Sequence, residues 1–218
     1  MKKNVMMRLS ALLLVAVLLT TCVISGTFAK YVTSNDGSET ARVAKWGVNV
    51  TAPTADLFKT DYDGTVTSSN SDELVAPGTT SSLADFTITG TPEVDVQVTY
   101  SAVLTLTGWS IGNPAEEYCP LIFTVNSSKY YIGATVGGSE IEDVDDLVTA
   151  VQSAIAAVSA SFEANNTITD TLQVSWAWEY ESSTLGTYQT DLKDTKLGDL
   201  DSAPSVTLNV ICTVTQVD

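Results

Sequence analysis

The sequence predicts an all-β fold: an antiparallel two-sheet β-sandwich, jelly-roll-like, with one amphipathic helix in a crossover. Three observations predict it. Several segments alternate apolar and polar residues, clusters of Gly, Pro, Asn and Asp separate these segments, and a single segment at about 140–163 has helical spacing. Strand and helix patterns do not alternate regularly, which argues against a parallel sheet. We therefore expect one sandwich domain over residues 41–218.

The clearest strand pattern covers residues 94–106. Val, Tyr, Ala and Leu occupy every second position, and mostly Asp, Gln, Thr and Ser lie between them. At ~3.3 Å per residue this strand would be about 40 Å long, with one buried and one solvated face. Shorter strands are predicted at 30–34, 41–52, 83–89, 119–125, 129–134, 168–180 and 205–217, with surface loops at 54–82 and 181–204.

The predicted helix begins with a capping box. Ser139 and Glu142 have the required spacing, and acidic residues are frequent in the first turns, where the helix dipole favours negative charge. A membrane-surface helix would have a basic polar face, whereas this face is acidic, so we expect the helix to pack on the protein's own sheet. Its apolar stripe consists of Ile141, Val144, Leu147, Val148, Val151, Ile155, Val158 and Phe162.

The N-terminus has the features of a secretory signal peptide over residues 1–29. Basic residues precede an apolar run at 9–23, and the small residues Thr27 and Ala29 form a cleavage motif. We expect cleavage between Ala29 and Lys30. A retained membrane anchor is the competing interpretation, but the apolar run is shorter than the ~20 residues that a bilayer core requires.

The chain is strongly acidic. It contains 26 acidic and 10 basic residues, for a formal net charge of −16. The predicted leader holds three of the basic residues and none of the acidic ones, so the exported chain is more acidic still. Such a surface repels phosphate backbones and anionic membranes, so we expect no nucleic-acid partner and no stable membrane anchor after cleavage.

The sequence contains no histidine. This excludes Ser-His-Asp triads, Cys-His pairs and zinc sites with histidine ligands. A pair of carboxylates could still act as a glycosidase pair, but acidic residues on polar strand faces more often serve as solvating groups. We expect a protein that is not an enzyme and has no catalytic residues.

Two acidic segments are weak candidates for calcium binding. Asp61 and Asp63 precede Gly64 as in the start of a calcium loop, but the later ligands of an EF-hand are missing. The loop at 181–204 carries Asp191, Asp194, Asp199 and Asp201. A solvated turn and a solvated loop are favoured, and no metal or cofactor is predicted.

Two pairs of residues leave alternatives open. Cys119 and Cys212 both lie in the inward phase of their strands, so they form a disulfide if those strands are neighbours, and otherwise act as small buried apolar residues. Trp176 and Trp178 lie on one strand face. Such a pair usually belongs to a core, and the alternative is a platform on which a sugar ring stacks.

Several short motifs lie at the two ends of the chain. An aromatic-bearing short strand follows the leader, and the other motifs are Gly26-Thr27-Phe28-Ala29, Trp176-Ala-Trp178, Asp194-Thr195, Leu197-Gly198 and the segment Thr213-Val-Thr-Gln-Val-Asp218. Together they resemble the SipW-dependent class of exported Gram-positive proteins, to which TasA and camelysin belong.

The resemblance implies a secreted jelly-roll subunit of a biofilm matrix or surface fibre. In that family, removal of the leader frees an N-terminal strand, which inserts into the sheet of the next subunit. The partners implied are further copies of the chain in a head-to-tail homopolymer, a dedicated signal peptidase and an accessory or anchoring matrix protein. The matching donor strand here is Lys30, Tyr31, Val32, Thr33 and Ser34, with residues 35–40 as its link.

The alternative function is a secreted β-sandwich that binds a carbohydrate or a host ligand. That function would use the platform of Trp176 and Trp178 or the surface loops. Camelysin is associated with proteolysis, but a chain without histidine offers no histidine-based metal site, so that activity is not carried over.

Overall fold

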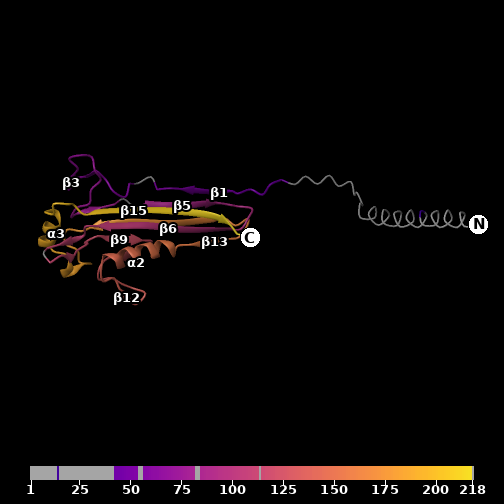
Figure 1. The fold of residues 1–218 in the computed structure, drawn as a ribbon. Helices are drawn as coiled ribbons and strands as arrows, with labels where there is room; N and C mark the ends of the chain where they lie inside the picture. Colours follow the sequence, from indigo (N-terminus) through magenta and orange to yellow (C-terminus); the bar gives the residue numbers. More distant parts are fainter. Residues whose placement is uncertain (1–13, 15–41, 54–55, 82–83, 113, 218) are drawn as a thin grey trace, which may run out of the picture. The chain divides into compact units, whose positions relative to one another are not determined.

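The computed structural model describes residue 14 and residues 42–53, 56–81, 84–112 and 114–217. Residues 44–218 form one unit with its own core, and all the elements below belong to it. This unit is mostly β, with several antiparallel sheets and the helices α2 and α3 (Figure 1). The predicted predominance of antiparallel strands is therefore confirmed.

The larger of the two main sheets has six strands, all antiparallel to their neighbours. Its centre is β14, which pairs with β5 on one side and with β9 on the other. The spatial order is β1 (Val48–Thr51), β5 (Ala84–Gly90), β14 (Ile168–Trp178), β9 (Ile122–Val125) and β10 (Ser128–Tyr130), with β4 (Thr79–Thr80) paired to the end of β14.

The second main sheet has three strands. Its order is β13 (Ala160–Phe162), β6 (Val96–Thr107) and β15 (Ser205–Gln216), and β15 pairs with β6 along all twelve residues. Three short ribbons complete the strands: β2 (Asp61–Tyr62) with β3 (Val66–Thr67), β7 (Ser110–Ile111) with β8 (Glu116–Glu117), and β11 (Thr135–Val136) with β12 (Ser139–Glu140).

Inward side chains of both main sheets meet in one hydrophobic core. The alternation predicted for 94–106 is confirmed in β6, where Val96, Val98, Tyr100 and Leu104 are buried and the residues between them are largely exposed. Buried and more exposed residues also alternate along β14. The core therefore lies between two strands predicted from the sequence, β6 in one main sheet and β14 in the other.

Helix α2 (Val144–Ala156) is shorter than the predicted helix. The capping box at Ser139 and Glu142 is wrong, because Asp143 is the N-cap and its side chain accepts from the amide of Asp146 at 2.8 Å. The predicted ends are strands instead, β12 before the helix and β13 after it. Since β10 belongs to the six-stranded sheet and β13 to the three-stranded sheet, α2 does lie in a crossover.

The two predicted surface loops contain regular structure. Residues 54–82 include β2, β3 and β4, and the segment 181–204 includes a 3-10 turn (Gly186–Tyr188) and α3 (Asp191–Gly198). The elements in both loops are short. Helix α3 is capped by Thr190, whose side chain accepts a hydrogen bond from the amide of Lys193. Its sequence has no apolar stripe of helical spacing, because Leu197 is its only buried apolar residue.

The edge strand β1 is held by a close approach of two glycines. Gly47 has φ +60° and Gly90 has φ +148°, and a Cβ on Gly90 would lie 2.0 Å from the carbonyl oxygen of Gly47. Just before β1, the amide of Lys45 donates to the Glu93 carboxylate at 2.8 Å. Strand β1 has four residues and is shorter than the predicted strand at 41–52.

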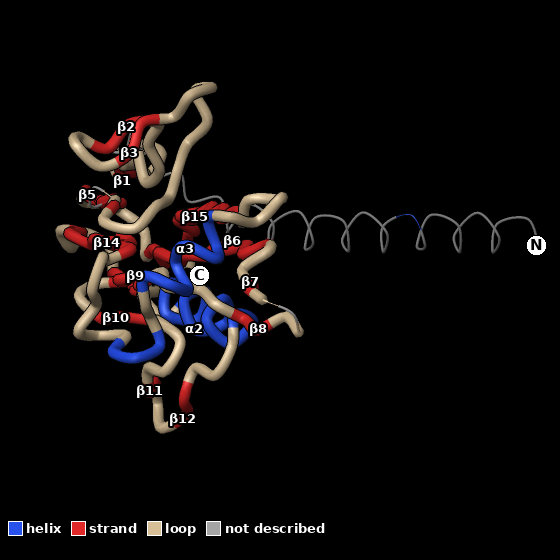
Figure 2. The backbone as a smooth tube through the Cα atoms, turned by 90° about the vertical axis from the view of Figure 1, so that its left-hand side faces the viewer, coloured by secondary structure: helices blue, strands red, loops and turns tan. Residues whose placement is uncertain are grey.

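The edge strands β1 and β15 of the two main sheets lie toward the same side of the unit. In Figure 2, β1 and β5 form the upper end of one sheet and β15 the upper end of the other, whereas α2 lies toward the lower end. Among the described helices, none has the length and apolar character of a membrane span.

Candidate functional site: the free edge of β15

Strand β15 is the long free edge of this unit. The other edge strands of the two main sheets are short: β1 has four residues, β10 has three and β13 has three. In contrast, β15 has twelve residues and, within the described part of the chain, pairs only with β6. Its outer edge therefore presents a row of backbone donors and acceptors that has no strand partner there.

The side chains of β15 do nothing to block pairing with another strand. Natural sheets protect long edges with lysine, proline, bulges or inward-pointing charges. The sequence of β15, SVTLNVICTVTQ, contains no charged residue and no proline, and its twelve-residue register with β6 has no interruption. By the rules that govern sheet edges, β15 is a template for another strand.

The inner face of β15 is incompletely covered. Its apolar side chains are only half-buried, whereas Val98, Tyr100 and Leu104 on the neighbouring β6 are buried. On the facing sheet, Val48 of β1 and Phe86 of β5 are also half-buried members of the core. An added strand could cover this apolar strip, which consists of Val206, Leu208, Val210, Cys212 and Val214.

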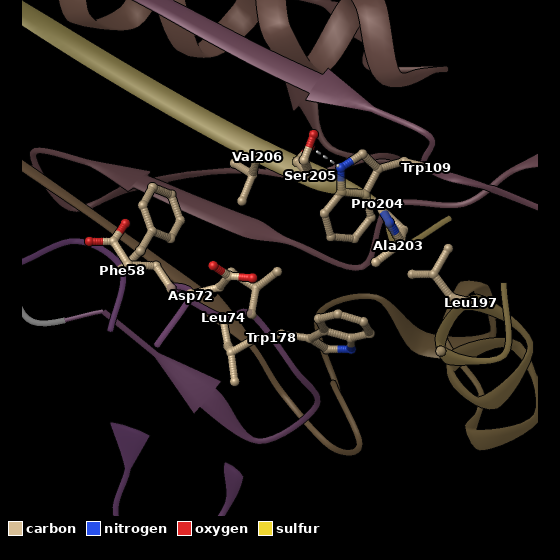
Figure 3. Close-up of a pocket in the computed structure, with 13 residues that line it drawn as sticks. Phe58, Asp72, Leu74, Trp109, Trp178, Leu197, Ala203, Pro204, Ser205 and Val206 are labelled. Atoms are coloured by element: carbon tan, nitrogen blue, oxygen red, sulfur yellow. Dashed lines mark hydrogen bonds between the residues drawn. The ribbon is translucent and has the colours of Figure 1, made fainter. Parts of the chain in front are cut away.

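A pocket of about 410 Å³ lies at the first residues of β15. Trp109 and Trp178 form one wall, with ring centroids 5.9 Å apart, and Nε1 of Trp109 donates to the carbonyl of Ser205 at 2.9 Å (Figure 3). The wall is therefore fixed to the start of the strand. The remaining lining residues are Phe58, Asp72, Glu73, Leu74, Val75, Leu197, Gly198, Ala203, Pro204 and Val206.

Trp176 and Trp178 lie in the core, and the alternative of an open sugar-stacking platform does not fit their burial. Trp176 is 1% exposed and Trp178 is 5% exposed, so neither offers an open ring face. Trp176 donates from Nε1 to the carbonyl of Leu57 at 2.7 Å and stacks on Phe58 with centroids 5.5 Å apart. The core interpretation of the pair is confirmed, and Trp176 fastens the segment after β1 onto the sheet.

The two cysteines are free thiols in the structure. Cys119 is fully buried, and burial raises the pKa of its thiol to about 12. Cys212 lies on the inner face of β15, where burial and then the charge of Asp170 raise its pKa. The sequence left open whether Cys119 and Cys212 form a disulfide, and in the structure they do not.

The acidic loop does not gather its carboxylates. Asp191 is exposed in the first turn of α3, whereas Asp194 points inward and accepts hydrogen bonds from Tyr118 and from Gln189. Among the described residues, no group of three or more acidic or cysteine side chains could hold a metal ion. Asp61 likewise lies in the β2–β3 ribbon, where it accepts from the hydroxyl of Thr67 at 2.6 Å.

The network around Asp194 was not predicted. Tyr118 precedes β9, Gln189 precedes α3, and the Gln189 amide also donates to the carbonyl of Glu179. Lys193 lies over the Tyr118 ring, 5.4 Å from its centroid. These contacts attach α3 to the sheets. The hydrogen bonds of Asp194 to Tyr118 and Gln189 are buried, and the acidic pattern in the sequence gives no indication of them.

The predicted cleavage site at Ala29 and Lys30, and the predicted donor strand at 30–34, lie outside the described residues. Comparison with protein-family models and with curated proteins finds no match for the chain. The features that bear on function are therefore the geometry of β15 and the sequence patterns of the N-terminus.

Proposed function

We propose that the chain is a secreted structural subunit of an extracellular matrix or surface fibre. A dedicated signal peptidase cleaves between Ala29 and Lys30, and the freed segment 30–34 of one copy pairs with β15 of the next copy. The observation that carries this proposal is the free edge of β15, which is long, uncharged and backed by a half-exposed apolar face.

The physical chemistry of strand addition supports this assembly. The added segment supplies backbone partners for the free edge, and the apolar side chains of Tyr31 and Val32 cover part of the strip on the inner face of β15. Donor and acceptor are different surfaces of one chain, so the contact is head-to-tail and leads to an open filament. The two main sheets would then form a jelly-roll-like β-sandwich whose long edge is completed by the neighbouring copy.

The donor half of the proposal is tested by a deletion. We would express the full chain with its leader, purify the exported protein, and confirm by mass spectrometry that it begins at Lys30. Deletion of residues 30–39 should abolish filaments in negative-stain electron microscopy while the circular dichroism spectrum stays that of a β protein. Filaments formed by the deletion variant as readily as by the wild type would contradict the proposal.

The acceptor half is tested at Leu208 and Val210. Both side chains are already half-exposed, so Leu208→Lys with Val210→Lys places charges on the edge without emptying the core. This double variant keeps its donor and should form no filaments by itself. The deletion variant keeps its acceptor, so a mixture of the two should give heterodimers and nothing longer. Filaments of the double variant alone would place the acceptor elsewhere.

A second candidate function is suggested by the pocket at the start of β15. Its volume suits a small ligand such as a sugar, which would contact the lining without stacking, because the rings of Trp109 and Trp178 are buried. Glycan-array binding by the exported protein that is lost in Trp109→Phe, but kept in the deletion variant, would support a binding module. Absence of binding to the array would remove this candidate.

A further inference from the structure

The outer face of the β6–β15 pair has an unusual composition. We call this surface the neutral face; it consists of the twelve outward-pointing residues of the two strands. Eleven of them are exposed and one is half-buried, and none is charged. They are Gln97, Thr99, Ser101, Val103, Thr105, Thr107, Ser205, Thr207, Asn209, Ile211, Thr213 and Thr215.

The absence of charge is notable in this chain. Charged residues make up 17% of the sequence, so twelve average positions would carry about two of them, and exposed positions normally carry more. The outward face of the other main sheet is different, since Asp85 of β5 and Lys129 of β10 are exposed there. The neutral face is therefore a gap in a strongly acidic surface.

The centre of the neutral face is apolar. Val103 and Ile211 are large hydrophobic residues that are exposed to solvent, at 58% and 51%. Val103 is opposite Asn209 and Ile211 is opposite Ser101, so the two apolar side chains lie on the diagonal between neighbouring pairs. An apolar centre with a rim of hydroxyl and amide groups is the composition of a protein interface.

We infer that the neutral face binds the neutral face of a second copy of this chain. Two copies of this strongly acidic chain repel one another over most of their surfaces, and the neutral face lets them approach without opposing carboxylates. The same patch on both copies gives an isologous, two-fold contact. It is lateral, and so distinct from the head-to-tail contact at the edge of β15.

The size of the face sets the strength of this contact. Two strands of twelve residues each, at ~3.3 Å per residue and about 4.8 Å apart, give roughly 400 Å² per copy. A standard interface buries about 800 Å² per partner, so a single pair of copies binds weakly. This step rests on the proposed function: along a filament, many such contacts act together, and side-by-side pairing of filaments becomes stable.

The test uses the exported protein and compares three acidic substitutions. Ile211→Glu and Val103→Glu each place opposing charges in the contact, whereas Leu192→Glu is the control, because Leu192 is an equally exposed apolar residue on α3, at 66%. Sedimentation velocity of the soluble pool should show weak dimers that increase between about 0.02 M and 0.5 M salt, as screening reduces the repulsion of the acidic surfaces. Ile211→Glu should weaken dimerisation at least about tenfold, and Leu192→Glu should not.

Filament width provides a second readout. In electron microscopy at high salt, wild-type and Leu192→Glu filaments should lie in pairs, while filaments of Val103→Glu, whose substitution lies on β6 and not on the acceptor strand β15, should be equally long but single. Pairing that survives both substitutions on the neutral face would overturn the inference. So would a wild type that stays monomeric at every salt concentration and binds a neutral polysaccharide instead. If no filaments form, the proposed function fails, and the soluble dimer still decides the lateral contact.

Discussion

The hydroxyl of Tyr100 on β6 donates a hydrogen bond to the carboxylate of Asp170 on β14, with 3.0 Å between the oxygens. The two residues belong to different main sheets, so the bond crosses the core. Asp170 occupies the inward phase of β14 between Ile168 and Leu172, both fully buried. A carboxylate at such a position requires a donor, and Tyr100 supplies it.

Replacement of Tyr100 by Phe should destabilise the protein by about 1–3 kcal/mol, because the ring volume is kept while the Asp170 carboxylate loses its donor. Urea unfolding followed by circular dichroism measures the change. Asp170→Asn keeps an acceptor for the hydroxyl and should cost less. Equal stability of Tyr100→Phe and the wild type would show that solvent satisfies Asp170.

Replacement of Trp176 by Phe should loosen the segment 56–67 from the sheet. The substitution removes the hydrogen bond to the carbonyl of Leu57 and shortens the ring that stacks on Phe58. We expect a loss of about 1–2 kcal/mol for the hydrogen bond and faster proteolysis within that segment. Trp46→Phe is the control, since Trp46 is 43% exposed. Proteolysis at the same rate in both variants would contradict this role of Trp176.

The two thiols should react at very different rates. Cys119 is fully buried, whereas Cys212 is half-buried on the inner face of β15. At about pH 8 we expect iodoacetamide to modify Cys212 at least about tenfold faster than Cys119, with Cys119 labelled only after denaturation. Mass spectrometry of peptides separates the two sites. Recovery of no free thiol without a reductant would instead indicate a disulfide.

Stability should fall in alkaline solution. Burial raises the pKa values of the Cys119 thiol and the Tyr188 hydroxyl to about 12, and burial followed by Asp170 raises that of Tyr100. In the unfolded chain these groups ionise near pH 8.5 and 10. The folded state thus holds the protons more tightly, so the stabilising contribution is complete below about pH 8.5 and is lost as the pH rises toward about 12.

Urea midpoints measured at steps from about pH 7 to about pH 11 check this dependence. They should decline steadily above about pH 9, and Cys119→Ala should make the first part of the decline shallower, because alanine has no proton to lose. A flat profile across this range would show that the buried groups ionise as easily in the folded protein as in the unfolded chain.

The long strands could be predicted from the sequence because each carries its own evidence. In β6 every second residue is apolar, in β14 only Asp170 interrupts the same pattern, and the structure buries most of these residues. The ends of α2 could not be predicted in the same way. Phe162 continues the helical spacing of the apolar stripe, yet it lies in β13 and pairs with Val96 of β6. Contact with a distant strand therefore outweighed the local pattern.

The site depended on distant contacts even more. The phase of Trp176 and Trp178 indicated a core, but the segment that covers Trp176 begins with Leu57, far away in the sequence. The free edge of β15 follows from the order of the strands, which no local pattern specifies. What the sequence did contain was the lack of charge in β15, and its meaning became clear once the strand was placed at an edge.

The register between β6 and β15 also determines when the sheet can form. Thr107 is opposite Ser205 and Val96 is opposite Gln216, so the paired residues are roughly 100 or more positions apart along the chain. As the chain emerges in order during synthesis or export, β6 must remain without this partner until residues 205–216 arrive. Contacts of such long range fold slowly, and a waiting β6 has an open edge of its own. Premature association between unfinished chains is thus a hazard of this topology, and it favours a strict order in which folding precedes assembly.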